Sequence, residues 1–265
     1  MDTGHNFLKH IAPAWLWKSA SPDHRSLRIG IPRMFFYYIY PGLWEIFFSE
    51  LGMEPVVSRP TTIKTVERAS QISETEHCLP NKLFDAHLAE LVGKVDMVFV
   101  PRVLSTIKNH LSCPKFGPLP DAARADIARE TKVLSIEIDE SRRPLSESLI
   151  LLGKQLKSQK SQIRSAMNSS LRAMESAKNL GVRSRRKKGG LRFLLIGHPY
   201  VIHDNFIAGP ILQKLEKMGG EVELISFAED APSKSYILWS TANLIYHTMK
   251  TLSREEYDGV IQITV

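Results

Sequence analysis

Hydrophobic positions along the first half of the chain alternate between short apolar runs and a spacing of three to four residues. The runs predict strands at 28–32, 55–58, 96–100 and 133–138. Helical spacing fills the intervals between the first three strands, with Thr62 as an expected N-cap and Gly52 as an expected helix end. Because parallel strands need long crossover connections, this alternation predicts an α/β fold with a doubly wound parallel sheet.

The second half repeats the pattern after a helical segment. Residues 145–180 have helical spacing, and a short basic stretch at 181–190 follows. Strands are then predicted at 191–196, 221–226 and 258–265, with helices at 207–218 and 240–251. We therefore divide the chain into an N-terminal arm (1–26), a first α/β domain (27–140), a helical connector with a basic linker (141–190) and a second α/β domain (191–265).

Composition agrees with a folded protein of two modules. The 265 residues are 43% hydrophobic and 24% charged, which is the globular range, and this length favours two domains over one. No apolar run is long enough to span a membrane, and the N-terminus has no small-residue cleavage site, so a cytoplasmic location is expected.

The net charge of +7 favours an anionic partner such as a nucleotide, coenzyme A or nucleic acid. Much of the excess lies in the run from Arg183 to Lys188, which is more simply a solvated linker. Nucleic acid is the least favoured of these partners because the run has no interleaved aromatic residues and belongs to no known nucleic-acid module.

Several catalytic motifs are absent from the sequence. It has no phosphate-binding loop ending in Gly-Lys-Ser or Gly-Lys-Thr, no dinucleotide fingerprint, no Gly-x-Ser-x-Gly and no His-Glu-x-x-His. The chain is therefore not itself an ATP-driven activase of the phosphate-loop type.

The only two cysteines, Cys78 and Cys113, are too few for a disulfide scaffold. Cys78 lies at the start of a predicted helix, whose free N–H groups favour a thiolate, and Cys113 lies in a loop after the strand at 96–100. Both positions are at the ligand-binding edge of a parallel sheet, and thiolates are the usual ligands of iron–sulfur clusters. The alternative is that both are small buried apolar residues.

Polar residues near the two cysteines are candidates for binding a cofactor. Lys82 and His87 can steady an anionic cluster or a phosphate, or be a solvated lysine and a core histidine. Arg102 can pair with a carboxylate or phosphate, or hold its loop through a salt bridge, and Lys115 has the same two interpretations.

A turn after the strand at 191–196 carries His198 and Tyr200. Their side chains can donate hydrogen bonds to a cluster sulfur or a thioester oxygen, oriented by Asp204. Alternatively, Pro199 locks a turn and Asp204 caps the next helix.

Four stretches occur together in one known family and in the same order. They are Ile29-Gly30-Ile31-Pro32-Arg33, Glu76-His77-Cys78-Leu79-Pro80, Cys113-Pro114-Lys115-Phe116 and Gly197-His198-Pro199-Tyr200. The sequence resembles the activase-associated branch of the 2-hydroxyacyl-CoA dehydratase and benzoyl-CoA reductase-like iron–sulfur family.

The resemblance implies two flavodoxin-like domains around a 4Fe–4S cluster that carries low-potential electrons. Cys78 and Cys113 match two of the cluster's ligand positions. Similar proteins have a third cysteine directly after the strand equivalent to 258–265, so the second domain is expected to be incomplete at its C-terminal side.

Two functions are therefore expected. The first is a cluster-binding electron-transfer protein that works with an ATP-dependent activase or a dehydratase subunit, and with an acyl-CoA ligand. The second is a cluster-free docking or regulatory scaffold for an activase.

Overall fold

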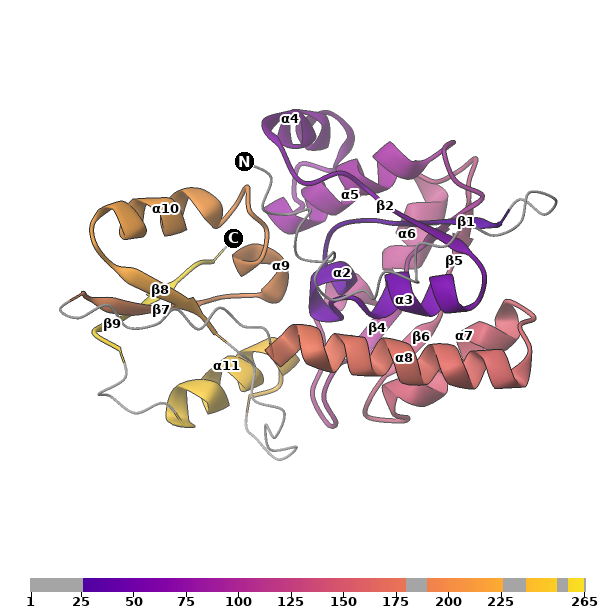
Figure 1. Ribbon diagram of the computed structural model, residues 1–265. Helices are drawn as coiled ribbons and strands as arrows, with labels where there is room; N and C mark the ends of the chain where they lie inside the picture. The colour runs from indigo at the N-terminus through magenta and orange to yellow at the C-terminus, as the bar shows by residue number, and fades with distance from the viewer. Residues whose placement is uncertain (1–25, 180–189, 226–236, 252–256, 265) are drawn as a thin grey trace.

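The computed structural model describes residues 26–179, 190–225, 237–251 and 257–264 (Figure 1). Residues 1–25 of the predicted arm and residues 180–189 of the predicted basic linker lie outside this part. No helix in the described ranges combines the length and apolar character needed to cross a membrane.

The first sheet has four parallel strands in the order β2-β1-β3-β5. Its strands are β1 (Arg28–Ile31), β2 (Glu54–Val57), β3 (Met97–Phe99) and β5 (Lys132–Leu134). A second pair, β4 (Arg102–Ser105) and β6 (Glu137–Asp139), is also parallel. The predicted α/β class with parallel pairing is confirmed.

Helices connect these strands by crossovers. They are α2 (Phe36–Ile39), α3 (Leu43–Glu50), α4 (Ile63–Ile72), α5 (Leu79–Leu91), the 3₁₀ helix η2 (Pro114–Phe116), α6 (Leu119–Ala125), α7 (Leu145–Gln155) and α8 (Lys160–Asn179). The chain steps from β1 to β2 in one direction and from β2 to β3 in the other, so right-handed crossovers place α3 and the α4–α5 pair on opposite faces. The long helix α8 packs against α3 and α7 (Figure 1).

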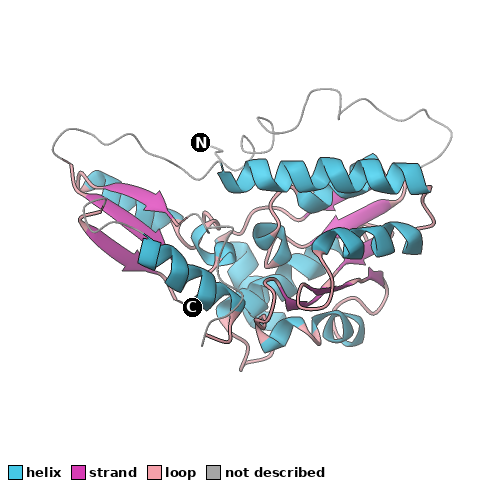
Figure 2. Ribbon diagram, turned by 90° about the horizontal axis from the view of Figure 1, so that it is seen from below, coloured by secondary structure: helices cyan, strands magenta, loops and turns pink. Residues whose placement is uncertain are grey.

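The second sheet repeats the central order of the first. Its parallel strands β7 (Arg192–Ile196), β8 (Glu221–Leu224) and β9 (Gly259–Gln262) lie in the order β8-β7-β9, with β7 in the middle. The helices of this part are α9 (Pro199–Ile202), α10 (Gly209–Lys217) and α11 (Ser240–Thr251). Figure 2 shows this sheet at one end of the molecule and the first sheet at the other.

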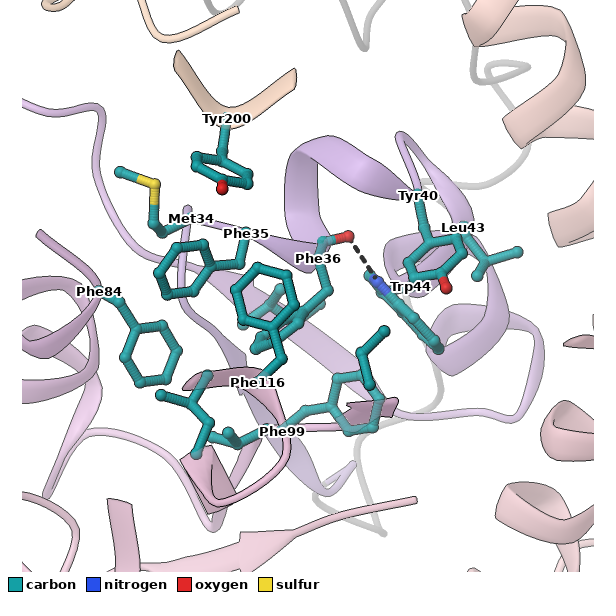
Figure 3. Packing of buried hydrophobic residues seen from close by; sticks show 14 of the residues in the cluster. Met34, Phe35, Phe36, Tyr40, Leu43, Trp44, Phe84, Phe99, Phe116 and Tyr200 are labelled. Atoms are coloured by element: carbon teal, nitrogen blue, oxygen red, sulfur yellow. Dashed lines mark hydrogen bonds between the residues drawn. The ribbon is translucent and has the colours of Figure 1, made fainter. Parts of the chain in front are cut away.

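An aromatic core anchors the first sheet to its helices. The Trp44 side chain is fully buried, and its indole N–H donates a 3.0 Å hydrogen bond to the Phe36 carbonyl (Figure 3). Its ring centroid lies 4.7 Å from that of Phe99. The buried polar atom is therefore satisfied while the ring excludes water from the sheet.

The predicted helix ends are confirmed. Thr62 caps α4 by accepting a hydrogen bond from the Thr65 N–H, and Gly52 follows α3 with a φ of 79°, which a glycine adopts without strain.

Two predicted elements differ from the structure. The stretch 133–138 forms two strands, β5 and β6, in different sheets, because the chain leaves the first sheet between them. The helix expected over 145–180 is interrupted between α7 and α8, where Lys157 has a φ of 58°. The strand β4 lies outside every strand that the pattern predicts.

Candidate functional site

The loops at the carboxyl ends of β1 and β7 meet in a cluster of aromatic rings, which we call the aromatic bridge: Phe35, Phe84, Phe116 and Tyr200. Phe35 lies at its centre, with ring centroids 5.6 Å from Phe84, 4.7 Å from Phe116 and 5.1 Å from Tyr200 (Figure 3). Phe35 and Tyr200 meet edge to face, a favoured geometry for aromatic pairs. The bridge joins helices that flank the first sheet to α9, which directly follows the second sheet's central strand β7.

Both cysteines are attached to elements that this bridge holds in place. Cys78 directly precedes α5, which carries Phe84, and Cys113 directly precedes η2, which carries Phe116. Both thiols are free and exposed. The interpretation of the cysteines as small buried apolar residues is therefore wrong.

The pKa of the buried Tyr200 phenol depends on its burial and on charge at the two cysteines. Burial raises the pKa of Tyr200 above its ordinary value, and the negative charges of the Cys113 and Cys78 thiolates raise the pKa further. The exposed ring of His198 stacks on the Tyr200 ring, with the centroids 5.0 Å apart.

The described residues do not form a complete metal site. Within these ranges, no three or more His, Cys, Asp or Glu side chains are grouped so that they can hold a metal ion. A 4Fe–4S cluster is normally held by four cysteines, of which this sequence has two. No cluster site is evident, and the thiol donors present fit half of a cluster's ligand set.

Arg102 holds the loop that carries Cys113. Its guanidinium donates hydrogen bonds to the Gly117 carbonyl and, at 2.5 Å, to the Asp121 carboxylate. This hydrogen bond from Arg102 keeps the pKa of Asp121 below its ordinary value. The alternative that Arg102 is a salt-bridged loop residue matches this geometry, while Lys115 of the same loop is exposed.

Replacing Arg102 by alanine is expected to loosen this loop. Backbone amide exchange over residues 112–117 should rise at least about threefold, because the Gly117 carbonyl loses a charged donor. Hydrogen exchange with mass spectrometry measures the change, and Arg129→Ala, which removes an exposed side chain bonded only to the Ala125 carbonyl, is the control. Unchanged exchange in Arg102→Ala would contradict the role of Arg102.

Lys82 and His87 occupy different environments on α5. Lys82 is half-exposed in the first turn. His87 is fully buried, with its Nδ1 atom 3.0 Å from the Ser58 hydroxyl and its Nε2 atom 3.1 Å from the Thr61 hydroxyl. Burial, followed by the charge of Arg33, lowers the pKa of His87 to about 4, so its ring is neutral at pH 7.

A buried carboxyl belongs to Glu45, in the first turn of α3. Both Glu45 carboxylate oxygens are inaccessible to solvent. Burial raises the pKa of Glu45 to about 7, against smaller opposing effects of a hydrogen bond from its own backbone and of Arg33. Sequence reasoning gave no signal for Glu45, because an acidic residue in the first turn of a helix is common on solvated faces.

Comparison with known proteins identifies the family. Residues 28–226 match the family described as the CoA enzyme activase uncharacterised domain, DUF2229. The chain belongs to this family. The matched range of the DUF2229 protein contains the first sheet, both cysteines, the aromatic bridge and α9.

A curated relative matches a smaller part of the chain. The HTH-type transcriptional regulator SgrR of Salmonella typhimurium (strain LT2) is 30% identical over 113 residues, which are 40% of this chain and 20% of that protein. The chain thus spans about a fifth of the length of this relative. So short a match identifies no shared activity.

Proposed function

We propose that this domain serves a CoA enzyme activase system by supplying Cys78 and Cys113 to a 4Fe–4S cluster whose other ligands come from outside the described residues. The observation that carries the proposal is that both free, exposed thiols directly precede elements whose aromatic rings, Phe84 and Phe116, pack on Phe35 of the aromatic bridge. When bound, such a cluster would supply low-potential electron transfer.

The surrounding residues have distinct roles in this proposal. Arg102 holds the loop of Cys113, and the aromatic bridge keeps both cysteine-bearing elements together. Tyr200 and His198, whose rings stack on one another, would donate hydrogen bonds toward a cluster sulfur, an interaction that tunes an iron–sulfur cluster. Lys82 and Lys115 add positive charge near the thiols, and each lies four residues or fewer from a cysteine in sequence.

The family description supports partners from an activase system, and we propose an ATP-dependent activase or a dehydratase subunit acting on an acyl-CoA. The flavodoxin-like character of the two domains and the kinship with the dehydratase iron–sulfur family belong to the same proposal. Similarity of the central strand orders β2-β1-β3 and β8-β7-β9 supports the first of these.

Anaerobic reconstitution with iron and sulfide tests the cysteines directly. The wild-type protein should take up both elements and develop a cluster absorption band, because thiolates are the preferred ligands. Cys78→Ser and Cys113→Ser should each bind iron at least about tenfold more weakly, since each removes half of the ligands that the chain supplies. Iron and sulfide analysis, together with electron paramagnetic resonance of the reduced protein, gives the readout.

Ser70→Ala is the control variant, because its exposed hydroxyl bonds only within α4 and lies on another element from either cysteine. Iron uptake that is equal in wild type and in the double serine variant would overturn the proposed ligands. If the protein takes up no iron but still binds an activase, the domain is instead a cluster-free docking scaffold.

A further inference from the structure

We infer that a buried hydrogen-bond chain, Ser58–His87–Thr61–Asp204, positions Tyr200 in the aromatic bridge, which packs the two cysteine-bearing elements together, by fastening α9 to the first domain. The inference concerns the same thiols as the proposed function, but it does not require that they bind a cluster. It assigns a positioning role to Thr61 and Asp204, which lie 143 residues apart in the sequence.

Asp204 is the point at which the two domains are joined. Its carboxylate is 1% exposed, and one oxygen accepts hydrogen bonds from the N–H groups of Phe206 and Ile207 at 2.8 and 3.2 Å. The other oxygen accepts from the hydroxyls of Thr61, at 2.5 Å, and Tyr38, at 3.3 Å, both in the first domain. A carboxylate with four donors is fully satisfied without water, which accounts for its burial between domains.

The proton positions along the chain follow from counting donors. The Asp204 carboxylate only accepts, so the single Thr61 hydroxyl proton points to it. The Thr61 oxygen must then accept from His87, which places the proton of the neutral imidazole on Nε2. His87 Nδ1 accepts from the Ser58 hydroxyl, whose oxygen in turn accepts from the Arg33 N–H at 2.8 Å.

Each hydrogen bond in this hydrogen-bond chain has a fixed donor and a fixed acceptor. His87 is held neutral by burial, so it has a single proton to give, and Tyr38 remains a donor because burial and the Asp204 charge raise the pKa of its phenol well above the ordinary value. A chain in which each donor has one acceptor disfavours other arrangements of α9, since any shift leaves buried groups unpaired.

The hydrogen-bond chain acts on Tyr200 through the short helix α9. Asp204 follows α9 by two residues, and Tyr38 belongs to α2, which packs against α9. Fixing Asp204 therefore fixes the edge-to-face contact between Tyr200 and Phe35, the ring on which the elements that directly follow Cys78 and Cys113 also pack. Tyr200 is 6% exposed, so the contacts of its ring depend on α9 staying packed against α2.

Thr61→Val and Thr61→Ser form a matched pair that tests this role. Valine keeps the shape of threonine but removes the hydroxyl, while serine keeps the hydroxyl. In Thr61→Val, amide exchange in α9 should rise about tenfold or more, because a buried carboxylate and the His87 N–H both lose their partner. In Thr61→Ser, exchange should stay close to the wild-type rate.

Thiol alkylation by iodoacetamide, measured on the cluster-free protein, tests the link to the cysteines. Both thiols should react at least about twofold faster in Thr61→Val than in the wild-type protein, because the Tyr200 phenol is no longer docked and no longer restricts the approach of the reagent. Unchanged exchange in α9 would overturn the positioning role. Raised exchange with unchanged alkylation would overturn the link to the cysteines. Neither result depends on iron uptake, so a failure here is distinct from a failure of the proposed cluster.

Discussion

Asp204→Ala is expected to lower the free energy of unfolding by about 4 kcal/mol, because it leaves several buried donors without an acceptor. The change removes the acceptor of the Thr61 and Tyr38 hydroxyls and of the Phe206 N–H, whereas the Ile207 N–H keeps the Asp204 carbonyl as an acceptor. Urea unfolding followed by circular dichroism measures the loss.

Asp126→Ala is the matched control for this prediction. Asp126 is exposed, so its replacement should change the free energy of unfolding by less than about 0.5 kcal/mol. A loss below about 1 kcal/mol in Asp204→Ala would mean that the Asp204 carboxylate is solvated and would contradict its burial.

Glu45→Gln is expected to stabilise the protein at pH 8 but not at pH 4.5. The pKa of Glu45 in the folded protein is raised to about 7, so the unfolded chain releases this proton first as the pH rises. Stability is therefore lost progressively from about pH 4.5 to pH 7, and a neutral glutamine avoids the loss. The difference in stability between variant and wild type should grow by about 2 to 3 kcal/mol over this range.

The comparison between variant and wild type is needed because other groups titrate as well. Glu140, with a pKa raised to about 7 by burial, acts in the same direction as Glu45, whereas His87, with a pKa lowered to about 4, destabilises the fold as the pH falls below about 6.5. Ser70→Ala, on an exposed position of α4, changes no titratable group and should show no pH-dependent difference from wild type. If the difference in stability between Glu45→Gln and wild type did not change with pH, Glu45 would be ionised in the folded protein at all of these pH values.

Hydrophobic spacing was enough to predict the fold class and most elements. Strands β1, β2, β3, β7, β8 and β9 lie within or next to the predicted runs, because a buried parallel strand needs a continuous apolar segment. The run at 133–138 forms two strands, because the chain passes from one sheet to another within it, and the local hydrophobic pattern does not predict this passage. Likewise, the break at Lys157 depends on how α8 turns to pack on α3.

The candidate site was predictable only in part. The position of Cys78 at a helix start followed from Pro80, which fits the first turn of a helix. Cys113 was expected in a loop, and the structure places it directly before the short helix η2. Ser58 and Thr61 were missed because isolated hydroxyl residues in a loop carry no sign of a partner 143 residues away. His87 was left with two interpretations, since helical spacing shows that it faces the core but not which groups bond to it.

Bridging the two cysteine sulfurs with a short reagent that alkylates two thiols is the most direct test of the central claim that Cys78 and Cys113 belong to one site. We predict that the folded, cluster-free protein forms an internal bridge between Cys78 and Cys113, identified by peptide mass spectrometry, and that the bridged protein no longer takes up iron. Separate single alkylation of each cysteine, with no bridge at any reagent concentration, would contradict the account.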